Sequence, residues 1–237
     1  MFFPDTERLI FLNRIHNVMK PIIFIGSGAV ASEVISYLED IEKLNPLQKF
    51  EVDGFLNDNE EDFRIKSEKY DFRGNFLGPI NEHQFSDDYS YIFGFADPNG
   101  KNNIAQKLDI ESLDFPTIIH PSVVISKSAK LGKGNIIYPN SVIGPNCEIG
   151  NFNLITSYSF ISHDCEIGDY NFLSTAGLAG NVKIGNKNFF GIRSTVIPSV
   201  TIGSENTIQA GMIIDKNVTD NETVFYRFKE KMTIIKQ

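Results

Sequence analysis

The residues best suited to chemistry are a histidine and an aspartate that are adjacent in the sequence, His163 and Asp164. A carboxylate beside an imidazole can hold the ring and favour its protonated form, which makes the histidine a better general base. An isolated surface histidine is the competing interpretation, because His163 follows the aliphatic Ile161 by two residues and should face outward from a corner. No serine or cysteine nucleophile pairs with His163 in the sequence.

The element that must position His163 is a repeat. A hydrophobic residue, Gly, two variable residues and Asn recur five times, at spacings of 18, 18, 17 and 18 residues. An aliphatic residue also recurs every six residues, which predicts one short strand and one corner per unit and three units per triangular coil of a β-solenoid. Residues 18 apart should stack, and the repeated Gly and Asn should take the positive φ that corners need. The cassettes are Leu131-Gly132 to Asn135, Ile149-Gly150 to Asn153, Ile167-Gly168 to Asn171, Ile184-Gly185 to Asn188 and Ile202-Gly203 to Asn206.

One coil of this solenoid is irregular. The interval from Gly168 to Gly185 is 17 residues, so the coil that follows His163 lacks one residue. Its segment Leu173 to Gly180 is small and uncharged, which would suit a wall for another chain or a thin ligand. We therefore expect the cofactor near this short coil, with a structural bulge without function as the alternative.

The remaining histidines and cysteines favour structural roles. His16 and His83 have no partner in the sequence and should lie at the surface, whereas His120 should be structural at a domain junction. Cys147 and Cys165 are 18 residues apart and should stack in adjacent coils. A disulfide between them is geometrically conceivable, but packing as buried free thiols is favoured. One histidine in the repeat is too few for a zinc site with three histidine ligands, and no metal is expected.

The segment ahead of the repeat has the pattern of a nucleotide-binding domain. Its order of apolar run, glycine turn and amphipathic run predicts a strand, a turn and a helix. Gly-x-Gly-x-x-Ala at such a turn is typical of Rossmann-like folds, where backbone amides at a helix N-terminus meet phosphate. Roughly 95 residues offer only half of a dinucleotide platform, so a mononucleotide head group is favoured over NAD. The candidate contacts are Gly26, Gly28, Ala29 and Val30 at the turn, Asn57 and Asp58 after a second strand, and Ala96 after a later one.

Composition and charge limit the function further. The 237 residues carry a formal net charge of −8, which argues against sequence-independent nucleic-acid binding. No apolar run reaches membrane-spanning length and no secretion signal is present, so a cytoplasmic protein is expected. We expect an added N-terminal helical segment at 1–18, a Rossmann-like domain at 19–115, a β-solenoid at 116–218 and a C-terminal tail at 219–237.

These residues together resemble the family of nucleotide-amino-sugar N-acetyltransferases and sialic-acid O-acetyltransferases. The resemblance covers about residues 20–218 and is most specific in Ile161–Tyr170, Leu178–Gly185 and Phe190–Ile192. It implies a Rossmann-like domain followed by a left-handed parallel β-helix. It also implies a homotrimer with acetyl-CoA as co-substrate and with sites between subunits.

The resemblance further implies a role for each matching residue. His163 would be the general base and Asp164 would raise its basicity. The Gly180 amide would meet the acetyl carbonyl, while Gly191 and Ile192 would lie along the CoA arm. Phe172 stands where the family often has a second histidine, so the cofactor contact there should be apolar. Two further departures are Ala96, where a glycine is common, and the ending Val224–Lys231, which replaces the usual Gly-x-Pro-Ala-Lys type and would have to supply other contacts to the adenine end of CoA.

Three functions follow in order of preference. The first is N-acetylation, by acetyl-CoA, of the amine of a UDP- or dTDP-linked 4-amino-4,6-dideoxy sugar for surface glycan biosynthesis, such as that of O-antigen lipopolysaccharide. The second is O-acetylation of a sugar or sialic acid hydroxyl, for which His163 would serve equally. The third is a non-catalytic sugar-nucleotide binding protein on the same scaffold.

Overall fold

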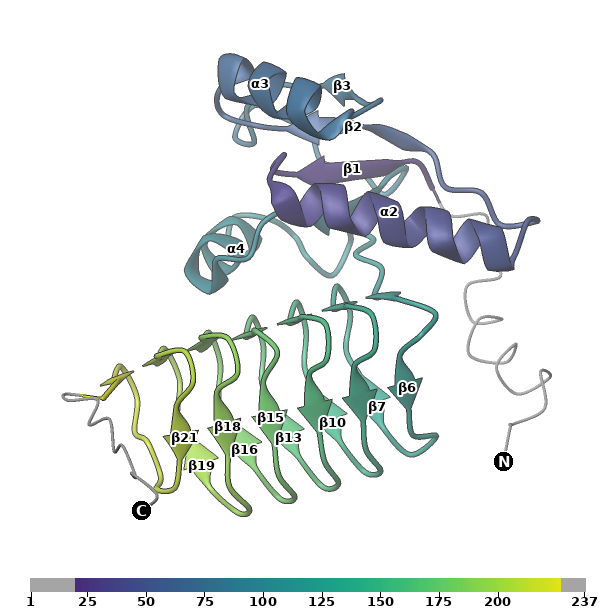
Figure 1. Cartoon of the computed structure of the whole chain (residues 1–237). Helices are drawn as coiled ribbons and strands as arrows, with labels where there is room; N and C mark the ends of the chain where they lie inside the picture. Colours follow the sequence, from purple (N-terminus) through teal and green to yellow (C-terminus); the bar gives the residue numbers. More distant parts are fainter. Residues whose placement is uncertain (1–19, 227–237) are drawn as a thin grey trace, which may run out of the picture. The chain divides into compact units, whose positions relative to one another are not determined.

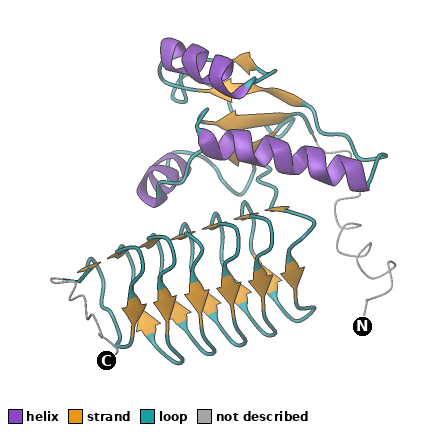
Figure 2. Cartoon of the chain, in the orientation of Figure 1, coloured by secondary structure: helices purple, strands orange, loops and turns teal. Residues whose placement is uncertain are grey.

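The computed structural model describes residues 20–226, which divide into two compact units. The first unit comprises residues 20–96 and Asn103–Pro121, and the second comprises Asp97–Asn102 and residues 122–226. The helical segment expected at 1–18 and the tail beyond residue 226 lie outside the described residues. Figure 2 shows helices only in the part of the chain that precedes the solenoid, and short strands along the solenoid itself.

The first unit is built on a parallel sheet with the strand order β3-β2-β1-β4. All four residues of β1 are buried, as expected for a parallel strand covered on both faces. The predicted strand, turn and helix are present, because β1 leads through Gly26 and Gly28 into α2. The elements that precede β6 in the chain are β1 Ile22–Ile25, α2 Ala29–Leu44, β2 Val52–Leu56, α3 Glu60–Tyr70, β3 Asn75–Phe76, β4 Ser90–Phe93, α4 Pro98–Ala105, which begins in the second unit and ends in the first, and β5 Ile118–Ile119.

The second unit is a solenoid of two-residue strands that stack into three parallel sheets, which Figure 1 shows as successive coils. Sheet I contains β8 Ile136–Ile137, β11 Leu154–Ile155, β14 Phe172–Leu173, β17 Phe189–Phe190, β20 Thr207–Ile208 and β22 Thr223–Val224. Sheet II contains β6 Val124–Ile125, β9 Val142–Ile143, β12 Phe160–Ile161, β15 Gly177–Leu178, β18 Thr195–Val196 and β21 Ile213–Ile214. Sheet III contains β7 Lys130–Leu131, β10 Glu148–Ile149, β13 Glu166–Ile167, β16 Lys183–Ile184 and β19 Thr201–Ile202.

The strand register confirms the predicted coil length. Ile149 pairs with Ile167, 18 residues later, and in both of these strands the first residue is exposed and the second is buried. The inward residues Ile143, Ile155 and Ile161 are at most 1% exposed, so the aliphatic ladder forms the core. These stacked parallel sheets fit the left-handed β-helix. None of the helices among residues 20–226 has the length and apolar character needed to span a membrane.

The missing residue is located in the turn between β14 and β15. Leu154 still pairs with Phe172 at a spacing of 18, whereas Phe160 pairs with Gly177 at a spacing of 17. The turn from sheet I to sheet II is therefore one residue shorter in this coil. This places the irregularity at a corner different from that of His163, which lies between sheets II and III.

The structural reason for the Gly and Asn cassette differs from the predicted one. Neither the cassette glycines nor the cassette asparagines have positive φ; the residues before the asparagines do, among them Phe152 and Tyr170. The glycines are required by close stacking, since a Cβ on Gly168 would lie 2.7 Å from the carbonyl oxygen of Gly185. The asparagines are required by hydrogen bonding: Asn171 Nδ2 donates to that same oxygen at 2.9 Å. The explanation from positive φ is therefore wrong, although the pattern itself predicts the fold.

Candidate active site

A four-residue corner from Ser162 to Cys165 holds His163 between β12 and β13. Asp164 turns the chain with φ +58°, a conformation that Asp tolerates better than most residues. Two backbone hydrogen bonds join this corner to its neighbours: Asp164 N donates to Pro145 O at 2.9 Å, and Asn181 N donates to His163 O at 3.0 Å. The position of His163 is thus set by the coils on both sides.

The two predicted catalytic side chains are hydrogen-bonded to each other. His163 Nδ1 lies 2.7 Å from Asp164 Oδ2, and the side chains are 55% and 45% exposed. The hydrogen bond from His163, and then the one from Asn146, lower the pKa of Asp164, so this carboxylate is ionised at neutral pH and only accepts. Nδ1 therefore carries the ring proton, which leaves the lone pair of His163 on Nε2.

The imidazole ring lies directly against Gly180 of the next coil. A Cβ on Gly180 would lie 2.6 Å from both Nε2 and Cε1 of His163, so only glycine fits beneath the ring. Gly180 is buried, and within residues 20–226 its backbone N–H has no hydrogen-bond partner. A buried N–H without a partner is rare in proteins, and here it lies beside the candidate base.

The corner position of His163 forms a column through the solenoid. Pro145, His163, Gly180 and Pro198 occupy the same position in successive coils, at spacings of 18, 17 and 18, as the backbone bonds Asp164 N to Pro145 O, Asn181 N to His163 O and Ser199 N to Gly180 O show. Proline has no N–H. In these four coils only His163 and Gly180 keep a donor at this position, and they are adjacent. Pro145 and Pro198 are thus a signal in the sequence that distinguishes the positions of His163 and Gly180 from the corresponding positions in the two flanking coils.

Asn146 is a contact that the sequence did not predict. Its Nδ2 donates to Asp164 Oδ1 at 3.2 Å, and its backbone N donates to Ser128 Oγ at 2.9 Å. Ser128, Asn146 and Asp164 are successive residues of one column, 18 apart. The spacing was the available signal, because each residue 18 before another lies beneath it.

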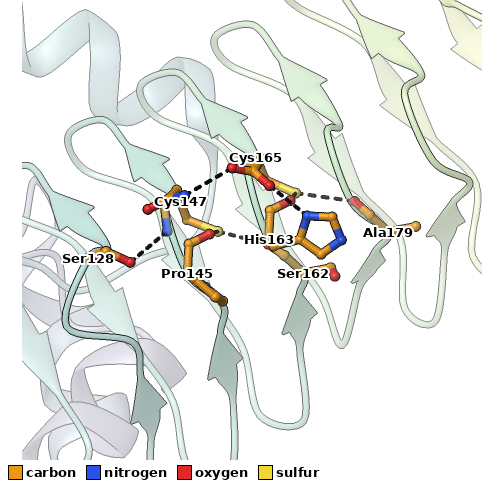
Figure 3. Close-up of polar contacts among 9 residues, drawn as sticks. Ser128, Pro145, Cys147, Ser162, His163, Cys165 and Ala179 are labelled. Atoms are coloured by element: carbon orange, nitrogen blue, oxygen red, sulfur yellow. Dashed lines mark hydrogen bonds and ion pairs between the residues drawn. The ribbon is translucent and has the colours of Figure 1, made fainter.

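The two cysteines lie directly behind this corner, as Figure 3 shows. Both are buried free thiols, as expected from the sequence. Cys147 Sγ lies 2.8 Å from Ser162 O, and Cys165 Sγ lies 3.2 Å from Ala179 O. The thiols thus contact the peptide groups that precede His163 and Gly180.

The other predicted acetyl-CoA contacts lie elsewhere on the solenoid. Phe172 is in sheet I, where its ring centroid is 4.8 Å from that of Phe189. Gly191 follows β17 and packs tightly, and the next residue, Ile192, is 54% exposed. These residues lie on or beside sheet I, near the short turn, and sheet II separates them from His163. A single chain therefore does not bring the two predicted groups together.

The glycine turn of the first unit is held by close backbone contacts. Gly26 has φ +92°, and Gly28 caps α2 without any side chain that could occupy the helix N-terminus. A Cβ on Gly28 would lie 2.9 Å from Gly94 O. Gly94 and Phe95, whose ring covers Gly26, were not predicted from the sequence. The turn presents the first amides of α2, where Ala29 is exposed and Val30 half-buried.

The remaining candidates of the first unit lie at the ends of β2 and β4. Asn57 Nδ2 donates to Ser27 Oγ at 2.7 Å and to Asp62 Oδ2 at 2.9 Å, so this amide connects the glycine turn to α3. Asp58 is exposed and accepts from Ile80 N at 3.1 Å. Ala96 is half-buried after β4. Asn57 is thus mainly committed to contacts within the protein, whereas Asp58 faces solvent.

Metal ligands are not gathered anywhere in residues 20–226. No group of three or more His, Cys, Asp or Glu side chains in that range could hold a metal ion.

Comparison with known proteins supports the architecture. No family model matches the chain, and no curated protein matches it in sequence. Three similar solved structures are GDP-perosamine N-acetyltransferase PerB from Caulobacter crescentus with CoA and GDP-perosamine (23% identity, 86% of this chain and 92% of that chain, TM-score 0.70), the acetyltransferase domain of PglB from Neisseria gonorrhoeae with acetyl coenzyme A (20%, 86% and 95%, 0.70) and WeeI from Acinetobacter baumannii (18%, 86% and 95%, 0.63). The structural neighbours of this chain are hexapeptide-repeat sugar acetyltransferases, and the chain shares their fold.

Proposed function

We propose that this protein transfers the acetyl group of acetyl-CoA to the amine of a nucleotide-linked amino-dideoxy sugar. The observation that carries the proposal is the contact between His163 and Gly180. It sets a side chain with a free lone pair beside a buried N–H that has no partner. A general base and an oxyanion donor are the two groups that direct acyl transfer to an amine requires.

The chemistry follows from these two groups. The neutral amine attacks the thioester carbonyl carbon, and His163 Nε2 accepts the proton that the amine loses. The carbonyl oxygen becomes an oxyanion and accepts a hydrogen bond from Gly180 N–H. When the C–S bond breaks, His163 returns the proton to the CoA sulfur. Asp164 keeps Nδ1 protonated throughout and stabilises the imidazolium form of His163.

The first unit supplies the features that a sugar nucleotide needs. The bare turn at Gly26 and Gly28 and the open N-terminus of α2 suit a diphosphate, and the exposed Asp58 is an acceptor for donors of a ribose or base. This unit has the strand-turn-helix order of a Rossmann-like domain. The similarity to an enzyme solved with GDP-perosamine adds GDP to the UDP and dTDP substrates that should be tested.

A second subunit should complete the site, and we propose a trimer. The outward residues of sheet II include Val124, Phe160 and Ile213, which are 62%, 51% and 61% exposed. Such a flat apolar face suits a neighbouring solenoid in a closed ring, whose sheet I side would bring its Phe172 and Ile192 to His163. Light scattering should give the mass of three chains. Phe160→Asp should lower this mass and Glu148→Gln, on sheet III, should not; a monomeric wild type contradicts the proposal.

The test of the activity is a thiol-release assay with acetyl-CoA. The acceptor panel contains UDP-, dTDP- and GDP-linked 4-amino-4,6-dideoxy sugars, their hydroxyl counterparts and free sialic acid. Amino sugars should release CoA, and His163→Gln should lower the rate of release by at least about 10²-fold while His83→Gln, in the first unit, should not. Release only with hydroxyl acceptors would establish O-acetylation instead. Binding of sugar nucleotides without any CoA release would leave a non-catalytic binding protein.

A further inference from the structure

The peptide group between Ala179 and Gly180 is held from behind by a thiol. Cys165 Sγ lies 3.2 Å from Ala179 O, and Cys165 is fully buried. Within residues 20–226 no other donor reaches this carbonyl. Figure 3 shows Cys165 and Ala179 joined in this way beside His163.

This hydrogen bond sets the direction of the Gly180 N–H. The described chain contains no cis peptide, and in a trans peptide the C=O and N–H point in opposite directions. Because the Ala179 carbonyl points inward to the buried thiol, the Gly180 N–H points away from that thiol. The thiol therefore acts on the same rigid peptide group that carries the proposed oxyanion donor.

The distribution of cysteine along the solenoid matches this role. The column below the corner reads Ala129, Cys147, Cys165, Val182 and Val200, at spacings of 18, 18, 17 and 18. Cys147 and Cys165 face the peptides that precede His163 and Gly180. By the same register, Ala129 and Val182 face the peptides that precede Pro145 and Pro198, and those peptides have no N–H. In the four coils from Ala129 to Val182, thiols thus face the two peptides that have an N–H, and apolar side chains face the two that precede proline; Val200, in the next coil, is apolar although proline does not follow there.

We infer that Cys165 is a positioning residue for acetyl transfer, which fixes and polarises the Ala179–Gly180 peptide so that its N–H meets the developing oxyanion. The inference rests on the proposed function. The effect belongs to the transition state, because the negative charge on the carbonyl oxygen develops only there.

The test replaces the thiol without leaving a cavity. Cys165→Val removes the donor and introduces the residue that the column already accepts at Val182 and Val200. Cys147→Val is the matched control, because it makes the same change behind the peptide of His163. Cys165→Ser keeps a donor in the same place with a shorter reach.

We expect Cys165→Val to lower kcat roughly tenfold, the scale of one neutral hydrogen bond, with the KM for acetyl-CoA unchanged. Cys165→Ser should recover part of this loss, and Cys147→Val should keep the wild-type kcat at a similar melting temperature. Equal kcat values for the two valine variants, or a loss confined to KM, would overturn the inference while leaving the enzyme intact. An inactive wild type across the acceptor panel would instead overturn the proposed function, and the positioning role with it.

Discussion

Two corners of the same solenoid use their hydrogen-bonding groups in opposite ways. At the corner between sheets III and I, the buried asparagines from Asn135 to Asn206 form a ladder. The side chains of Asn153, Asn171 and Asn188 bond the coils on both sides; Asn171 Oδ1, for example, accepts from Asn188 N at 2.9 Å. At the corner between sheets II and III, a shorter run of side-chain hydrogen bonds joins Ser128, Asn146 and Asp164. There His163 and Gly180 keep N–H groups without partners.

The difference shows that, within one repeat, one corner stabilises the fold and another presents the candidate active site. Both corners are built on the same inward aliphatic ladder and the same strand register. A corner whose polar groups are mostly bonded within the protein supports the fold, because few groups remain to bind a ligand. A corner that leaves donors open loses some stability but gains a site. Variants at each corner should therefore affect different measurements.

The largest effect should come from His163. We expect His163→Gln to lower kcat by about 10²- to 10⁴-fold, the range of general base catalysis, with the melting temperature unchanged because the side chain is half-exposed. Steady-state kinetics with the best acceptor of the panel checks this. A variant that keeps more than half of the wild-type kcat would show that the open corner is not the site of chemistry.

Gly180→Ala should have the next largest effect. Its Cβ would lie 2.6 Å from His163 Nε2, so the ring must move, and a misplaced base costs roughly 10²-fold in kcat. Gly177→Ala is the matched control, since a Cβ there would meet Thr195 Oγ1 at an ordinary 3.4 Å. Equal kcat values for the two alanine variants would contradict the proposed contact.

The Asn ladder should respond in stability and not in catalysis. Asn171→Ala leaves Asn188 N and Gly185 O without their side-chain partner, and two unsatisfied buried groups cost about 2–4 kcal/mol. Denaturant unfolding measures this loss, with the exposed Asn99→Ala as control. The kcat per folded molecule should not change; if it falls as it does for Gly180→Ala, the two corners are not functionally distinct.

A buried lysine at the corner between sheets III and I should make the stability of the protein depend on pH. Lys101 Nζ lies 3.4 Å from Phe152 O at that corner, and burial lowers the pKa of Lys101 to about 7. Between pH 7 and about 10 the unfolded chain binds the proton that the folded chain has released, so this group makes stability rise with pH in that window. Lys101→Met should remove the rise and stabilise the protein by about 1–3 kcal/mol at pH 7. Melting curves from pH 6 to 10 check this. Lys130→Met, at an exposed position, should keep the wild-type slope of stability against pH. An unchanged slope in Lys101→Met would show that the amine is not buried in solution.

The smallest effect should come from Asn146. Asn146→Gly removes its hydrogen bond to Asp164 but keeps the positive φ of 57° that the position requires, so we expect kcat to fall only about threefold, less than the loss of one full hydrogen bond. Asn140→Gly is the control, because Asn140 has nearly the same φ, 60°, at another corner. A loss equal to that of His163→Gln would mean that Asn146 contacts a substrate.

Much of the fold could be predicted from the sequence, because residues that stack in neighbouring coils are separated by a regular spacing. The spacing of 18 predicted which residues stack, and the interval of 17 predicted the short coil. The strand, turn and helix around Gly26 and Gly28 followed from one apolar run and two glycines. The cause assigned to the cassette was wrong, since close coil-to-coil contacts and side-chain hydrogen bonds, not positive φ, require its Gly and Asn.

The site was predictable only in part. His163 and Asp164 are adjacent in the sequence, so their pairing could be predicted directly, whereas the role of Gly180 was predicted only from the family resemblance. Phe172, Gly191 and Ile192 lie across sheet II from them, and their role stays a prediction. Asn146 and the facing thiol of Cys165 were not predicted, because the spacing of 18 indicates which residues stack but not which of their atoms are in contact.

The sequence by itself determined the period, the register and the candidate base, since all three depend on residue types at regular intervals. Only the tertiary structure decided that the His163 ring lies on Gly180, that the N–H of Gly180 has no partner and that a thiol holds its peptide from behind. The physical reason is that these contacts join atoms of different coils. Their geometry depends on the direction of each peptide group and side chain. The stacking of the coils establishes these directions, and the order of residue types along the sequence does not specify them.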